Sequence, residues 1–302
     1  MKKAQYFILI GIIALGFASC QGDKFGPSIF IDPVADTTAC TREFDQWLYK
    51  HYTAKYNVEF LYKLDDSSTD PNYNVVPVSI GKADTIAHLA LYLWYDVYDT
   101  VAGPTFLLDN GPKIIQLIGS AMISASQGTE KLGYAEGGSK ITLLKINKME
   151  TDNIEQLNEY IFKTMHHEFA HILHQQKAYP KDFGLITPYD YDPNRWQDRS
   201  SEEAWEMGYV SPYASSQTRE DFVETIANYI VKTDKDWNHM MSVAGETGGA
   251  AITQKLEMCR SWLKEKWEID LDAMRAEVQK RQANLDWDYI MSLGFLHENE
   301  EN

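Results

Sequence analysis

The stretch MHHEFAHILHQ, residues 165–175, places four of the chain's eight histidines and one glutamate within about three turns of a helix. On a helix, His167 and His171 lie one turn apart on the same face, because successive residues rotate by about 100°. Both imidazoles can then reach one cation at about 2.0–2.1 Å, the bond length of zinc to histidine. Glu168 lies beside that face. The pattern is H-E-x-x-H, which predicts two zinc ligands and a glutamate that acts as general base toward a zinc-bound water.

The other two histidines of the stretch do not fit the same ion. His174 lies within about 20° of His167 around the helix but about 10 Å further along it, so one ion cannot contact both. The longer pattern H-E-x-x-H-x-x-G-x-x-H is not matched, because His174 occupies its glycine position and Lys177 its third histidine. His174 is therefore either a substrate contact or a structural histidine, and His166, which points away from the ligand face, is predicted to be structural.

A third ligand must come from another segment, and the best source is TREDFVET, residues 218–225. Glu220 and Glu224 are four residues apart and share one face of a helix predicted over 219–232, with Thr218 and Asp221 as its cap. A carboxylate suits zinc. Three other glutamates compete for the role on the residues alone, in SEEAWEM: Glu202, Glu203 and Glu206.

HEFAH followed by EDFVE resembles the gluzincin metallopeptidases, in which an E-x-x-x-E or E-x-x-x-D helix supplies the third ligand. More narrowly, GYVSPYASSQTREDFVETIANYI, residues 208–230, is similar to a family of zinc-binding metallopeptidase lipoproteins of Bacteroidetes. It also resembles the catalytic domain of anthrax lethal factor, in which a tyrosine stands seven residues before the ligand glutamate. Tyr213 stands seven residues before Glu220 here.

The resemblance implies a role for each residue that it covers. Glu220 would be the third zinc ligand, and Glu224 would hydrogen-bond a ligand histidine and fix its tautomer. Tyr213 would donate its phenol hydrogen to the developing oxyanion. The implied cofactor is one Zn²⁺ per chain, and the implied reaction is hydrolysis of peptide bonds.

The pattern along the rest of the chain predicts an α+β fold, and the resemblance makes it zincin-like: a small mixed sheet, the HExxH helix and a mostly helical C-terminal part. Segment 139–146 is expected to be an edge strand, by resemblance to other zincins, and to pair with an extended peptide. The elements predicted besides the helix that begins at residue 151 are helices over 41–56, 83–99, 250–266 and 270–284, and strands over 57–64, 113–120 and 139–146.

The first twenty residues, MKKAQYFILIGIIALGFASC, have the two lysines, apolar run and small residues of a secretory signal peptide. FASC resembles a bacterial lipobox, so residues 1–19 are predicted to be the signal peptide and Cys20 the lipidated residue. Residues 20–40 form a predicted tether and 41–302 the metallopeptidase domain. Within that domain, 41–178 is predicted to be an α/β part with the HExxH helix, and 179–302 a helical part with the third ligand.

Composition restricts the partners. The formal charge is −16, from 28 basic and 44 acidic residues. Such a chain repels nucleic acid and anionic membrane surfaces, so membrane attachment is expected through the lipid on Cys20 alone. The other two cysteines, Cys40 and Cys259, are too few for a disulfide scaffold or a thiolate zinc site, and their separation in sequence does not decide whether they pair.

These features predict a zinc metallopeptidase anchored as a lipoprotein in the cell envelope, at the outer membrane, on its periplasmic or outer face. Its substrate is a peptide or protein. One alternative is a surface lipoprotein that binds glycan or peptide and keeps a structural or vestigial zinc site, because 13% aromatic residues suit stacking on sugars. A second alternative is a protein that self-assembles through its C-terminal helices.

Overall fold

The computed structural model describes residues 39–64, 74–123, 130–131, 133–136 and 139–290. The predicted signal peptide, Cys20 and almost all of the predicted tether lie outside these residues, and the domain boundaries stay predictions. Within the described ranges, no helix is both long and apolar enough to cross a membrane. The fold is α+β, as predicted, with a small sheet and many helices.

The sheet has the strand order β1 (Glu59–Leu61), β2 (Ile114–Leu117), β6 (Lys140–Leu143) and β5 (Gly133–Glu136). The first three strands are parallel, with Ile115 opposite both Phe60 and Ile141, and β5 runs antiparallel to β6. Side chains on both faces of β2 and β6 are buried, which is typical of parallel strands covered by helices. A separate pair, β3 (Met122–Ile123) and β4 (Glu130–Lys131), is antiparallel.

The prediction that 139–146 is an edge strand is wrong. In the structure β6 lies between β2 and β5, so both of its sides are paired, and β5 is the edge strand on that side of the sheet. The sequence of 139–146 indicates a strand, but it does not indicate which strands lie beside it. Its second neighbour is β5, which pairs antiparallel with β6.

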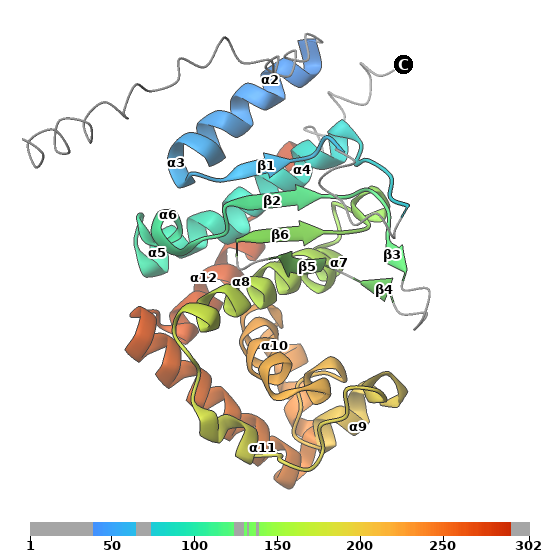
Figure 1. The fold of residues 1–302 in the computed structure, drawn as a ribbon, viewed down its shortest axis with the longest axis vertical. Coiled ribbons are helices and arrows are strands. Elements are labelled where there is room, and N and C mark those ends of the chain that lie inside the picture. Colours follow the sequence, from blue (N-terminus) through green and yellow to red (C-terminus); the bar gives the residue numbers. More distant parts are fainter. Residues whose placement is uncertain (1–38, 65–73, 124–129, 132, 137–138, 291–302) are drawn as a thin grey trace, which may run out of the picture. The chain divides into compact units, whose positions relative to one another are not determined.

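Helices precede and cover the sheet (Figure 1). α2 (Ala39–Leu48) continues through a π-helical turn, Tyr49–Thr53, into α3 (Ala54–Tyr56). The second helical segment is formed by α4 (Ile80–Ala90), a π-helical turn at Leu91–Tyr95, and α5 (Asp96–Ala102), followed by the short α6 (Phe106–Asn110). Large aromatic side chains, including Tyr52, Trp94 and Tyr95, are fully buried where these helices meet. The predicted helices over 41–56 and 83–99 are confirmed.

The HExxH segment is helical, as predicted. α7 (Ile154–Leu157), a π-helical turn at Asn158–Phe162 and α8 (Lys163–Gln176) follow one another without a break. Asn153 caps this helix by accepting from the Gln156 amide at 3.0 Å. α8 packs against β5 and β6 and, on its other side, against α10 (Thr218–Val231). This helix therefore lies between the sheet and the C-terminal helices (Figure 1).

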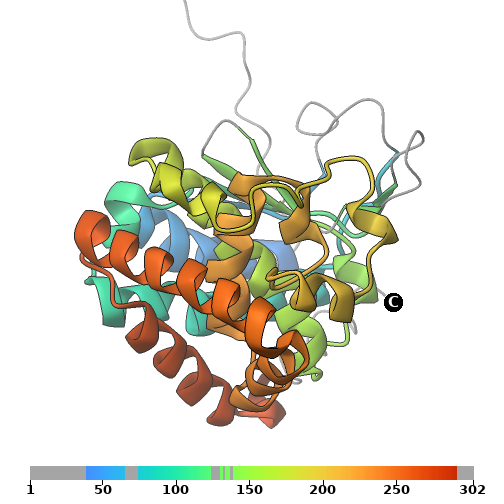
Figure 2. The ribbon, with the colours of Figure 1, turned by 90° about the horizontal axis from the view of Figure 1, so that it is seen from below.

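The C-terminal part is helical, as predicted, with α9 (Ser201–Glu206), α10, α11 (Asp234–Trp267) and α12 (Leu271–Ala283). α11 begins well before the predicted residue 250, with a kink at Gly245, whose φ is +66°. Besides α8, α10 contacts both α11 and α12 (Figures 1 and 2). Cys259 on α11 is a free, fully buried thiol.

The close approach of α11 to α9 depends on a glycine. A Cβ built at Gly248 would lie 2.3 Å from the Trp205 carbonyl oxygen and 2.6 Å from that of Glu206, whereas one at Gly249 meets nothing nearer than 3.7 Å. Gly248→Ala is therefore expected to destabilise the fold by about 1–3 kcal/mol through overpacking against backbone.

Gly249→Ala is the matched control, since it adds the same methyl group to the same helix without a clash. It is expected to leave the free energy of unfolding unchanged or to raise it by up to about 1 kcal/mol, because alanine favours helix more than glycine does. Urea denaturation followed by circular dichroism measures both. Equal effects of the two substitutions would contradict the packing argument.

Candidate metal centre

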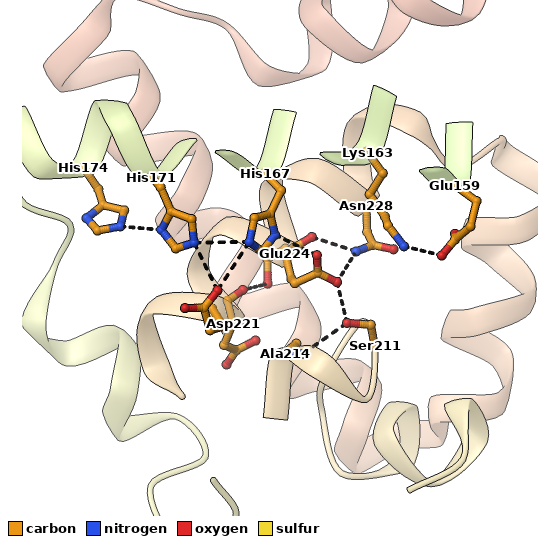
Figure 3. Close-up of polar contacts among 12 residues, drawn as sticks. Glu159, Lys163, His167, His171, His174, Ser211, Ala214, Asp221, Glu224 and Asn228 are labelled. Atoms are coloured by element: carbon orange, nitrogen blue, oxygen red, sulfur yellow. Dashed lines mark hydrogen bonds and ion pairs between the residues drawn. The ribbon is translucent and has the colours of Figure 1, made fainter. Parts of the chain in front are cut away.

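His167 and His171 of α8 point toward α10 (Figure 3), and three side-chain atoms from the two helices converge on one point. Nε2 of His167 and Nε2 of His171 are 3.1 Å apart. Oε2 of Glu220 lies 3.0 Å from Nε2 of His171 and 3.3 Å from Nε2 of His167. Among the residues that the structure describes, His167, His171 and Glu220 form the group that could hold a metal ion. The three belong to the segments that the sequence singled out.

The hydrogen-bond partners of the other ring nitrogens explain why this point would attract a cation. Nδ1 of His167 lies 2.8 Å from Oε1 of Glu224, a carboxylate that can only accept, so this nitrogen carries the hydrogen and Nε2 keeps its lone pair. Nδ1 of His171 lies 2.9 Å from Nε2 of His174 and can donate to it, which again leaves Nε2 as an acceptor. When both imidazoles are neutral, two lone pairs and a carboxylate oxygen therefore face one another.

The spacing of these acceptors suits zinc. Ligands bound at about 2.0–2.1 Å to one tetrahedral ion lie about 3.3 Å from one another. The three observed separations, 3.0, 3.1 and 3.3 Å, are close to that value. Two histidines and one carboxylate are also a usual donor set for a catalytic zinc ion, which keeps a further coordination position open.

The titration of the cluster shows an excess of negative charge. Burial alone would lower the pKa of His167, but the hydrogen bonds to Glu220 and Glu224 outweigh it and raise this pKa to about 10. Burial likewise would raise the pKa of Glu220, yet the hydrogen bonds from His167 and His171 hold it well below its usual range. The cluster thus takes up a proton when no other positive charge is present.

Glu224 is held by two neighbours that the sequence did not single out. Oε2 of Glu224 accepts from the Ser211 hydroxyl at 2.5 Å and from Nδ2 of Asn228 at 3.1 Å. The Ser211 oxygen also accepts from the backbone amide of Ala214 at 3.1 Å (Figure 3). Asn228 follows Glu224 by four residues, a spacing that could have indicated the contact, whereas no sequence signal points to Ser211.

Tyr213 lies at the edge of the cluster, on the short helix Tyr213–Ser216 that follows Ser211. Its ring centre is 5.9 Å from that of His167 and 5.0 Å from that of Trp196, and its side chain is 37% exposed. Partial burial, followed by the charges of the nearby glutamates, Glu220 first, raises its pKa well above the usual range. The phenol therefore keeps its hydrogen and can act as a donor.

Glu168 is buried beside His167, with 8% of its surface exposed. It follows His167 directly on α8, and its charge contributes to the raised pKa of both His167 and Tyr213. The structure thus gathers the predicted base, the predicted phenol donor and the predicted metal ligands around one point.

The face of α10 that meets α11 carries a buried ion pair. Nζ of Lys255 lies 2.7 Å from Oδ2 of Asp221 and donates to the Gly208 carbonyl at 2.8 Å, and both charged side chains are fully buried. Tyr191 also donates to Oδ2 of Asp221. The prediction that Asp221 caps α10 together with Thr218 is wrong, because Asp221 points inward to Lys255 and no side chain caps this helix.

The remaining candidates lie away from the cluster. Glu202 and Glu203 are exposed on α9, where Glu203 forms a capping box with Ser200, and Glu206 lines a different pocket. His166 is buried, 3.2 Å from the Tyr98 hydroxyl, and burial lowers its pKa to about 3.

An α+β fold with a cluster of two histidines and one glutamate that could hold a metal ion is consistent with what comparison with known proteins finds. The chain belongs to the family described as "Putative zinc-binding metallo-peptidase", whose model matches residues 37–272. It is similar to the crystal structure of a "putative zinc-binding metallo-peptidase" from Bacteroides caccae ATCC 43185, with 40% identity and a TM-score of 0.71 over 83% of this chain and 96% of the other. No curated protein matches. The predicted family is confirmed.

Glu220→Gln tests the third acceptor of the cluster. The substitution keeps the size of the side chain but removes its charge, so zinc affinity is expected to fall by more than about 100-fold, beyond the usual effect of losing an outer hydrogen-bond partner. Competition with a chromophoric chelator measures it. Glu206→Gln is the control and should bind zinc as the unaltered chain does. Comparable losses in both variants would place the ligand elsewhere.

His174→Phe tests the hydrogen bond to His171. The ring centres of His174 and Tyr179 are 5.4 Å apart, and phenylalanine preserves a ring at this contact. It removes the acceptor for Nδ1 of His171. Zinc affinity is expected to fall about 10–100-fold, as is usual when the partner of a ligand histidine is lost. His174→Gln, which offers a new acceptor, should recover part of the affinity. An unchanged dissociation constant for His174→Phe would show that this contact does not orient His171.

Proposed function

We propose that the chain is a zinc-dependent peptidase in which His167, His171 and Glu220 hold one zinc ion per chain. The observation that carries the proposal is the convergence of three acceptor atoms within 3.3 Å of one another between α8 and α10. Bound there, zinc would polarise a peptide carbonyl and lower the pKa of a water molecule. Membership of a family described as zinc-binding metallo-peptidases supports the same assignment.

Glu168 is the proposed general base. It follows His167 directly on α8, and its side chain is buried. In the proposed reaction it takes a proton from the attacking water, whose oxygen bonds to the scissile carbonyl carbon. It then gives that proton to the departing amine as the carbon–nitrogen bond breaks, so that the carboxylate is regenerated.

Tyr213 is the proposed donor to the carbonyl oxygen, which becomes negatively charged when water attacks. The raised pKa of its phenol keeps the hydrogen available, and the packing of its ring against Trp196 and His167 limits its movement. Hydrogen bonds to such an oxyanion are a large part of catalysis in acyl transfer. Hydrogen bonds through Ser211 and Glu224 connect the Tyr213 turn to His167. They thereby limit the movement of the Tyr213 turn relative to the His167 imidazole.

A peptide substrate is proposed to bind along β5. This strand is the edge of the sheet beside α8, whereas the strand expected for this role, β6, is paired on both sides. An extended peptide can add to such an edge through backbone hydrogen bonds. Lipidation of Cys20 and attachment to the outer membrane remain part of the proposal, and they are supported by the N-terminal sequence.

Glu168→Gln tests catalysis separately from metal binding. Zinc content should stay at one per chain, while cleavage of a mixed peptide library, followed by mass spectrometry, should fall by about 10²–10⁴-fold because the base is lost. Glu155→Gln, an exposed change on the preceding turns of the same helical segment, is the control and should cleave normally.

The alternative, a lipoprotein that binds glycan or peptide around a structural zinc ion, gives a different result. The unaltered chain would then hold zinc and cleave no member of the library, and Glu168→Gln would change nothing.

A further inference from the structure

A pocket of about 490 Å³ adjoins the metal centre. Its lining includes His174, Tyr179, Lys181, Leu185 and Thr218. Two of these residues connect it directly with the centre. His174 is hydrogen-bonded to His171, and Thr218 begins α10 two residues before Glu220. A peptide held at the centre therefore has this pocket within reach of a neighbouring residue.

The charge of this pocket differs from that of the chain. The chain has 44 acidic residues, yet none in the part that the structure describes lines the pocket, whereas Lys181 does. Arg219 directly follows Thr218, which lines the pocket, so a second cationic residue stands next to the pocket wall. Arg219 donates from Nε to Oε1 of Glu220 at 3.0 Å, and its side chain is 59% exposed.

A second pocket provides a contrast. It is lined by two arginines and four acidic residues: Asp192, Asp198, Glu203 and Glu206. A carboxylate entering that pocket would meet an excess of negative charge. Of these two pockets, the one beside the metal centre is the one that complements an anion.

The shape of the wall also selects the occupant. The Tyr179 ring stacks on Phe222 at 4.7 Å and meets the edge of His174 at 5.4 Å, which fixes one apolar side of the pocket. Leu185 is 68% exposed and adds a second apolar surface. A short methylene chain that ends in a carboxylate would contact these surfaces and place its charge near Lys181.

We propose that this pocket is a substrate subsite for a carboxylate, carried either by an acidic side chain or by the C-terminus of the peptide. The proposal rests on the proposed function, since the occupant is a residue of the peptide cleaved at the adjacent centre. It identifies Lys181 as a residue that determines specificity and assigns the preferred substrates to acidic peptides or to peptides with a free C-terminus.

Equilibrium binding to the zinc-loaded Glu168→Gln variant tests the subsite without turnover. Peptides amidated at the C-terminus and differing only by Glu or Gln at one position form the first set. Peptides that differ only by a free or amidated C-terminus form the second. A carboxylate is expected to improve affinity about five-fold in at least one set, as one ion pair at a partly exposed site does, and the gain should shrink in high salt.

Lys181→Met, added to Glu168→Gln, should reduce that five-fold ratio to nearly one. Lys235→Met is the matched control, since Lys235 is an exposed lysine at the start of α11, and it should retain the full ratio. Discrimination in the first set alone assigns the pocket to an acidic side chain, and in the second alone to the C-terminus. An equal ratio in the two lysine variants, or no preference in either set, overturns the subsite.

Cleavage by the unaltered chain separates the two proposals. Cleavage without any preference for a carboxylate overturns the subsite and leaves the peptidase function in place. Complete absence of cleavage by the zinc-loaded chain overturns the proposed function, and the subsite with it.

Discussion

The site depends on one constraint: two imidazole nitrogens and a carboxylate oxygen face one another at 3.0–3.3 Å. Such an arrangement is repulsive unless a positive charge occupies its centre. Without a metal, the hydrogen bonds to Glu220 and Glu224 raise the pKa of His167 to about 10, so that a proton supplies the positive charge. The hydrogen bond that Nδ1 of His167 donates to Glu224 directs Nε2 inward, so the orientation of this imidazole is set before any ion binds.

Helix α10 holds buried charge on two faces. Glu220 and Glu224 turn toward α8, and Asp221 turns toward Lys255 of α11. Burying so many carboxylates in one turn of helix is unfavourable unless each is paired. The pairing with Lys255 therefore fixes the rotation of α10 about its axis, and that rotation decides whether Glu220 reaches His171. The Asp221–Lys255 ion pair in the core therefore also contributes to the position of Glu220 beside His171.

The sequence predicted what depends on helical periodicity. The spacing of His167 and His171 places both on one face, and the same rule gives Glu220 and Glu224 a common face, so their convergence could be expected once two helices meet. Features that depend on tertiary position were missed. The place of β6 inside the sheet depends on the return of β5, and Asp221 resembles a capping residue until the opposing Lys255 is known. The roles of the side chains as ligands and catalysts stay predictions.

His174 shows how one substitution in a motif changes the design of a site. In the longer H-E-x-x-H-x-x-G-x-x-H pattern, glycine at this position lets the chain turn and bring a third histidine to the metal. Here α8 continues to Gln176, so a third ligand would have to come from another helix, and Glu220 of α10 lies where it could be that ligand. The residue that replaces glycine instead stands one turn after His171 and accepts its Nδ1 hydrogen. The same ring also forms a wall of the neighbouring pocket, so a single side chain contacts both the proposed ligand His171 and the proposed substrate subsite.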